Sequence, residues 1–334
     1  MPSSEAPAVT PVPTKAPSPG GPKAVPGPRP IEGRSPWALA WERLRHDRVA
    51  IGSALVIVLV ALMAICAPLI ALATGHGPDK TFPLTGLTPA GLPRPPSATF
   101  LLGTDDLGRD LLVRVAYGAQ ISLLVGVAAT GLAVAIGVVI GLVSGYFAGA
   151  VDSLLARVMD IVLSFPLLLF AIALVVIVGP SLLVTIFVIA FFSWAPVGRV
   201  VRGQTMALKE REFVEAARAL GARASRVMFV EILPNITAPI LVYATLLVPA
   251  SIAFEATLSF LGLGIVPPTP DWGSMLAEAV GYYQVAWWFL VFPGGALVAT
   301  TLAFNLLGDA VRDALDPRAG AIFGVRVEAG AKEA

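Results

Sequence analysis

Six long apolar runs divide the chain and restrict what it can fold into. A helix needs about 20 apolar residues to cross the hydrocarbon core of a bilayer, because each residue adds about 1.5 Å. The runs lie at about 50–73, 121–145, 158–178, 182–198, 236–260 and 286–307. Only 13% of the residues are charged, which is about half the fraction of a soluble domain. The sequence therefore predicts an all-α, polytopic membrane protein with six transmembrane helices.

The lysines and arginines are distributed unevenly among the segments that join these runs. If the N-terminus is cytoplasmic, six spans return the C-terminus to the same side, and 19 of the 23 basic residues lie inside. Only Lys80, Arg94, Arg109 and Arg114 lie outside. Such an excess of positive charge is typical of cytoplasmic loops. Both termini and the loop 203–234 are therefore predicted to be cytoplasmic, and the net charge of +1 gives no indication of a nucleic-acid partner.

The same orientation assigns the other segments to domains. Residues 1–36 are rich in Pro, Ala, Ser and Gly and have little to bury, so they are predicted to form a disordered cytoplasmic tail. Residues 319–334 are predicted to form a second cytoplasmic tail. Between the tails, 49–318 forms the six-helix transmembrane domain, with extracytoplasmic segments at 74–120 and 262–285.

Residues 37–48 combine aromatic and basic side chains just before the first run. Trp37 and Trp41 share one helical face, and three arginines lie beside them. This pattern predicts an interfacial elbow helix. A simple flank of positive charge with aromatic anchors fits the same residues equally well.

A polar stretch, Lys209–Pro234, interrupts the apolar runs. Helical spacing places four apolar residues of this stretch on one stripe: Phe213, Ala217, Leu220 and Ala224. Gly221 stands where a left-handed cap would end the helix, and a second short helix is expected to stop near Pro234. The stretch is too polar to cross a bilayer and too short to fold alone, so we expect it to lie against another surface.

Carboxylates occur at two informative places. Glu255 lies near the outer end of the fifth run, and ionisable groups at membrane depth are functional candidates, here for a translocation pathway or gate. The alternative is that Glu255 caps a neighbouring element or faces water. Asp105, Asp106 and Asp110 cluster before the second run, and their spacing favours helix caps and salt bridges over a calcium site.

Several kinds of catalytic chemistry are missing from the sequence. No lysine follows a glycine, so the Gly-Lys pair of a phosphate-binding P-loop does not occur. His46 and His76 are far apart, and there is no G-x-S-x-G nucleophile motif. We therefore expect a chain that is not an enzyme and that holds no cofactor or metal of its own. If ATP drives the protein, another chain must bind it.

Several motifs together resemble a known family. Glu215, Ala216 and Ala217, followed by Gly221 and then by the Leu-Pro pair at 233–234, resemble the EAA signature of the membrane subunits of ABC importers. In that family an isoleucine commonly precedes the Leu-Pro pair by two places, whereas this chain has Glu231 there and Ile232 after it. Three further stretches resemble the C-type permease of the dipeptide, oligopeptide and nickel transporters. They are LGTDDLGRDLLVRVAYGAQISL (102–123), EATLSFLGLGIVPPTPDWGSML (255–276) and FNLLGDAVRDALDPR (304–318).

The resemblance implies a type I permease fold in a bacterial inner membrane, forming half of a pathway for dipeptides or oligopeptides. It also implies a second, homologous permease subunit, two ATPase subunits that bind ATP and Mg, and an extracytoplasmic substrate-binding protein. The cytoplasmic loop would dock on an ATPase through Phe213, Glu215, Ala216, Ala217, Arg218, Leu220, Gly221, Leu233 and Pro234. Nickel, glutathione and oligosaccharides are alternative cargoes.

An alternative of another class is a secondary transporter or channel without ATPase partners. Such proteins place several ionisable residues in the middle of their spans or show inverted internal repeats. Neither feature is evident in this sequence.

Overall fold

The computed structural model of the chain describes residues 36–315, so the two expected tails lie outside the described residues apart from Pro36. Within 36–315 the fold is all-helical and contains no strand. The elements are α1 (Pro36–Leu44), α2 (Arg48–Ile65), α3 (Ala67–Thr74), α4 (Leu111–Phe147), α5 (Gly149–Ser164), α6 (Leu167–Val178), α7 (Leu182–Leu208), α8 (Glu212–Ala219), α9 (Ala224–Arg226), a π-helical turn (Val227–Ile232), a 3₁₀ turn (Leu233–Ile236), α10 (Thr237–Phe260), α11 (Trp272–Ala279) and α12 (Trp287–Leu315).

Five helical stretches are long and apolar enough to cross a membrane: α2, α4, α7, the stretch Ala224–Phe260 and α12. The bent pair α5 and α6 makes a sixth if it counts as one span. The chain is therefore a polytopic helical membrane protein, as the apolar runs predict.

The third expected span, 158–178, is not one straight helix. α5 and α6 meet at an angle of 84° at a break that contains Pro166. Phe165, the residue before the proline, is extended, as the proline ring requires of its neighbour. The third apolar run is therefore divided by a full break between two helices.

Two other spans differ from the apolar runs that predict them. The first run, 50–73, is divided at Cys66, because Pro68 lies in the first turn of α3. The fourth, 182–198, continues as α7 to Leu208. α7 can extend beyond the apolar run because its arginines find partners on α5: Arg199 pairs with Asp160 at 2.6 Å, and Arg202 pairs with Asp152.

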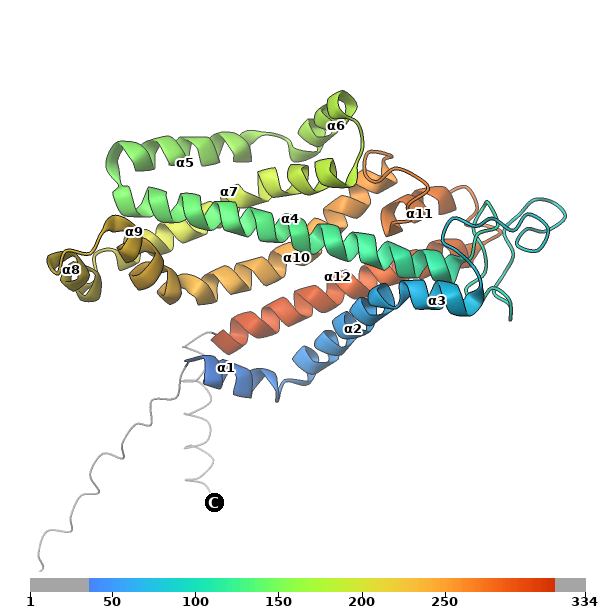
Figure 1. The fold of residues 1–334 in the computed structure, drawn as a ribbon, viewed down its shortest axis with the longest axis horizontal. Coiled ribbons are helices and arrows are strands. Elements are labelled where there is room, and N and C mark those ends of the chain that lie inside the picture. Colours follow the sequence, from blue (N-terminus) through green and yellow to red (C-terminus); the bar gives the residue numbers. More distant parts are fainter. Residues whose placement is uncertain (1–35, 316–334) are drawn as a thin grey trace, which may run out of the picture. The chain divides into compact units, whose positions relative to one another are not determined.

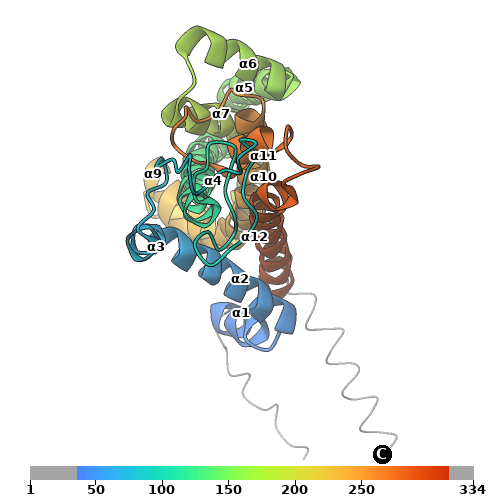
Figure 2. The same ribbon diagram turned by 90° about the vertical axis from the view of Figure 1, so that its right-hand side faces the viewer.

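The long helices separate two groups of short elements. α8 and α9 lie at one end of the long helices, and α3, α11 and the irregular segment 75–110 lie at the opposite end (Figure 1). Seen from the second of these ends, α1 and α2 lie on one side and α5 and α6 on the other (Figure 2). α4, α7, α10 and α12 lie between these two sides.

α4 and α7 pack closely along much of their length. Gly137, Gly141 and Gly145 recur at every fourth position of α4, so they share one face. A Cβ atom at any of them would lie 2.6–2.7 Å from a carbonyl oxygen of α7, which is too close for a real contact. Small residues at such spacing let two helices approach closely within lipid. These three glycines therefore set the distance between α4 and α7.

We expect Gly141→Ala to destabilise the protein by about 1–3 kcal/mol, because the added methyl forces the two backbones apart. Gly131→Ala on the same helix is the matched control, since no atom lies within 4 Å of a Cβ at that position. The control should be neutral or stabilising by about 0.4–1 kcal/mol, because alanine favours the helix. Thermal unfolding of the purified protein in nanodiscs measures both. Equal loss in the two variants would contradict this account of the α4–α7 contact.

Candidate functional site

The EAA-like stretch forms the short helix α8. Glu212 and Glu215 lie in its first turn and Arg218 in its last, an arrangement that the helix macrodipole favours. The helix ends before Gly221, whose φ of +81° is the left-handed conformation that glycine adopts without strain. The helical stripe therefore stops at Leu220. The expected extension of the stripe to Ala224 is wrong, because that residue begins a different helix.

α8 is held against its own chain by two contacts. Val214 is fully buried in a cluster with Val227 and Ile232 of the π-helical turn. The guanidinium of Arg218 lies 5.0 Å from the centre of the Tyr146 ring, near the end of α4. Val214, which lies beside the expected stripe, was not identified from the sequence. Arg218 was expected to contact an ATPase subunit, whereas in the structure it contacts Tyr146 of its own chain.

Most of the other side chains of α8 are exposed in the described chain. Leu220 is 90% exposed and Phe213 is also exposed, as are Glu215 and Ala216, whereas Ala217 is half-buried. Large apolar side chains that protrude at a helix end are typical of contact surfaces. They lie at the α8 end of the long helices (Figure 1).

Leu233 and Pro234 are separated from this exposed group. Leu233 is half-buried against the cluster that holds Val214, and Pro234 is exposed in the 3₁₀ turn. The second short helix was expected to stop near Pro234. Instead, the helical stretch from Ala224 passes through the π-helical and 3₁₀ turns and reaches Phe260. Irregular helical turns of this kind are frequent at functional sites.

Glu255 lies in the interior of the described chain. Its side chain is 0% exposed, and its carboxylate accepts hydrogen bonds from Ser122 of α4 and Ser259 of α10, both at 3.0 Å. The alternative that Glu255 faces water is therefore wrong for this structure. Asp271, which was not identified from the sequence, begins α11 where this helix packs on the turn of α10 that contains Glu255, and it caps α11 by accepting from the backbone N–H of Ser274.

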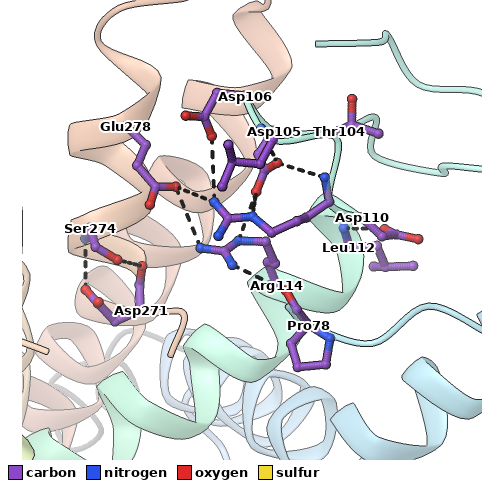
Figure 3. A network of polar contacts seen from close by, with 12 residues as sticks. Pro78, Thr104, Asp105, Asp106, Asp110, Leu112, Arg114, Asp271, Ser274 and Glu278 are labelled. Carbon is purple, nitrogen blue, oxygen red and sulfur yellow. Dashed lines mark hydrogen bonds and ion pairs between the residues drawn. The ribbon is translucent and has the colours of Figure 1, made fainter. Parts of the chain in front are cut away.

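A cluster of acids and arginines ties the segment 75–110 to α4 and α11 (Figure 3). Asp105 accepts from Nε of Arg109 at 2.5 Å and pairs with Nε of Arg114 at 3.2 Å. Glu278 of α11 pairs with the same two arginines at 3.2 and 3.6 Å. The sequence contains all of these residues, but their long-range pairing, above all that of Glu278, leaves no signal in it.

The three aspartates that cluster before the second run do not converge on one point, as the expected caps and salt bridges imply. Asp110 caps α4 by accepting from Leu112 N and contacts Nδ1 of His76 at 2.6 Å. Oxygens of Asp105, Asp106 and Glu278 do lie within 4.8 Å of one another. The guanidinium groups of two arginines occupy the same cluster, however, and already supply positive charge to these acids (Figure 3). Caps and salt bridges therefore account for the acids.

Burial raises the proton affinity of two acids of this cluster, Asp106 and Glu278. It raises the pKa of Asp106, and the neighbouring Asp105 adds to the effect, while Arg109 opposes it. Burial likewise raises the pKa of Glu278 against the lowering effect of Arg114 and Arg109. The arginines thus offset part of the cost of burying these carboxylates.

Comparison with known proteins identifies the family. Residues 137–320 match the model of the binding-protein-dependent transport system inner membrane component. The chain belongs to this family. Residues 35–89 match a second model, the N-terminal TM domain of oligopeptide transport permease C. The chain is therefore a permease subunit of a binding-protein-dependent transport system.

Relatives across the family are similar over nearly their whole length. The oligopeptide transport system permease protein OppC of Escherichia coli (strain K12) is 44% identical over 86% of this chain and 93% of its own. The di/tripeptide transport system permease protein DppC of Pseudomonas aeruginosa is 42% identical over 85% and 93%. The glutathione transport system permease protein GsiD of Escherichia coli O6:K15:H31 is 41% identical over 88% and 95%.

A solved structure supports the fold. A chain of the inward-facing MetNI methionine ABC transporter superposes with a TM-score of 0.50 at 18% identity, covering 61% of this permease and 96% of that chain. At this identity the likeness concerns the fold alone. The permease therefore has the fold of an ABC importer membrane subunit.

We expect Arg114→Met to destabilise the permease by about 3 kcal/mol, because it leaves buried carboxylates short of a cation. Arg94→Met is the control from the adjoining segment, since Arg94 is exposed and forms no ion pair within residues 36–315. Its cost should stay below about 1 kcal/mol. Thermal unfolding measures both changes, and a control as damaging as Arg114→Met would show that the arginine cluster is not what stabilises this end.

Proposed function

We propose that this permease forms half of the translocation pathway of an ABC importer for dipeptides or oligopeptides. The support comes from the relatives described above, whose names give oligopeptides, di- or tripeptides, or glutathione as the cargo. Glutathione is itself a tripeptide. Peptides are therefore the shared cargo class, and glutathione is the second candidate. No feature of the described residues favours nickel or an oligosaccharide.

The exposed face of α8 carries the proposal that the permease is driven by a partner ATPase. Val214 and Arg218 fix α8 to its own chain, while Leu220 and Phe213 remain available to another. We propose that this face, with Glu215, Ala216 and Gly221, docks on an ATPase subunit that binds ATP and Mg. α8 and the N- and C-termini are then cytoplasmic, in a bacterial inner membrane.

The connections of α8 explain how docking would move the spans. α7 ends at Leu208, just before α8, and the helical stretch that begins at Ala224 continues into α10. A displacement of α8 is therefore passed to two spans without a long flexible loop on either side. α4 follows α7 because of the close glycine contact.

The remaining partners follow from this arrangement. A second, homologous permease subunit completes the pathway, and two ATPase subunits bind on the α8 side. A substrate-binding protein docks at the opposite end, where α11 and the segment 75–110 lie (Figure 1). Glu255 remains our candidate for a gate. Because it is fully buried, it acts by holding helices together and not by touching the cargo.

We expect Leu220→Arg to reduce recovery of the ATPase subunits with the permease by about 10-fold or more, as the loss of an apolar anchor at an interface does. The fold should be unaffected, because the side chain is 90% exposed. Leu84→Arg is the matched control: Leu84 is 91% exposed but lies in the segment at the opposite end. Co-purification from membranes measures the effect. Full ATPase recovery with Leu220→Arg would refute docking through this face.

The cargo can be tested with the complete complex in proteoliposomes. We expect di- and tripeptides, presented with the binding protein, to stimulate ATP hydrolysis and to accumulate inside. Ni²⁺ and oligosaccharides should do neither. Stimulation by reduced glutathione alone would select the second candidate, and stimulation by Ni²⁺ or a sugar alone would exclude peptides as the cargo class.

A further inference from the structure

The first turn of α11 is wedged between α4 and α10. A Cβ atom on Gly273 would lie 2.3 Å from the carbonyl oxygen of Ala256, so only glycine allows this approach. The indole of Trp272 is fully buried and donates from Nε1 to the carbonyl of Val115 on α4 at 3.1 Å. The residues at the start of α11 therefore lie directly against the turn of α10 that contains Glu255.

Two buried carboxyl groups meet at this junction. Glu255 and Asp271 are both 0% exposed, and the packing of Gly273 on Ala256 and Ser259 brings the start of α11 to the turn that contains Glu255. Within residues 36–315, no lysine or arginine forms an ion pair with either one. The nearby Arg114 is instead paired with Asp105 and Glu278. Two adjacent carboxylates without a cation would repel each other, and burying even one uncompensated charge is costly.

Two serine hydroxyl groups donate hydrogen bonds to the carboxyl group of Glu255. Its Oε1 accepts from Ser259 and its Oε2 from Ser122. The Oγ of Ser259 also receives the backbone N–H of Ile265 at 3.4 Å, which leaves the hydroxyl hydrogen for Glu255. Each oxygen of Glu255 therefore already accepts one hydrogen bond, and an ionised carboxylate can only accept.

The hydrogen bonds of Asp271 are incomplete. One carboxyl oxygen, Oδ1, accepts from Ser274 N at 2.9 Å and caps α11 (Figure 3). The other, Oδ2, is buried and has no hydrogen-bond partner. A buried polar atom without a partner is rare, and a proton on it would supply a donor towards its acidic neighbour.

We propose that the carboxyl groups of Glu255 and Asp271 share one proton, in a hydrogen bond that includes Oδ2 of Asp271, as a clasp that holds α11 on α10. The clasp removes one of the two negative charges and satisfies the unpaired oxygen in a single step. A charge-assisted O–H···O⁻ bond of this kind is about twice as strong as a neutral one.

The position of the clasp gives it a role in coupling. α11 is joined to the arginine cluster through Glu278, and α10 continues at its other end into the turns that support α8. Movement of the α11 end, where we place the binding protein, would therefore reach the span that leads to α8. This consequence rests on the proposed function, whereas the clasp itself does not.

Two substitutions separate the clasp from the helix cap. Asn and Ser are comparable N-caps, so both Asp271→Asn and Asp271→Ser preserve the cap on α11. Only Asn can also reach Glu255 and donate an N–H in place of the acid O–H. In hydrogen exchange of the purified complex, we expect Asp271→Ser to reduce protection of the α11 amides by about 10-fold or more, and Asp271→Asn to change it by less than about threefold.

Infrared spectroscopy detects the proton directly. The wild-type complex at neutral pH should show the carbonyl band of a protonated, buried carboxylic acid. Asp271→Asn should lose it, because the amide N–H then takes the place of the shared proton against an ionised Glu255. Asp309→Asn, at an exposed carboxylate of α12, should keep the band. The absence of a band in the wild-type minus Asp271→Asn difference spectrum would overturn the clasp, even if Asp271→Ser does not assemble. Equal loosening of α11 by Asn and Ser would also overturn it. Neither measurement uses transport, so failure of the peptide proposal would leave both results interpretable.

Discussion

The close approach of α4 and α7 is the contact on which the arrangement of the other spans depends. Three glycines at four-residue spacing bring the backbone of α4 against the carbonyl groups of α7. Lipid chains are as apolar as the helix surfaces, so burial alone does not pull helices together in a bilayer. Shape complementarity has to do so, and side chains larger than hydrogen at these positions would prevent it. α10, α2 and α5 then pack around α4.

Polar chemistry is concentrated at the two ends of this helical frame. At one end the arginine cluster joins α4, α11 and the segment 75–110, with guanidinium groups compensating buried carboxylates. At the other end α8 keeps its charged and apolar side chains exposed. At the first end the charged groups are paired within the chain, whereas at the second the charged and apolar side chains of α8 are exposed. This difference is the physical basis for assigning a partner to the face of α8.

Sequence reasoning succeeded where local chemistry decides the outcome. Apolar runs of sufficient length became helices, and Gly221 ended α8 because only a left-handed residue fits there. It failed where distant segments decide. A proline within an apolar run is compatible with a bend, but the angle of 84° between α5 and α6 was not predictable from Pro166 itself. The π-helical turn that carries the chain past Pro234 had no sequence signal. Ala224 was assigned to the wrong helix because the apolar stripe was continued past the cap at Gly221.

The sequence singles out Glu255 as a functional candidate, but it does not show which residues surround this carboxylate. Its depth in an apolar run marks it as unusual, and this much can be read from the sequence. Its partners come from α4, from one turn along α10 and from the start of α11, up to 133 residues away in sequence. A lone buried carboxylate suggests an ion pathway. In this chain, however, both oxygens of the carboxylate already accept hydrogen bonds from serine hydroxyls of α4 and α10, so its own chain engages the atoms that it could offer to a cargo.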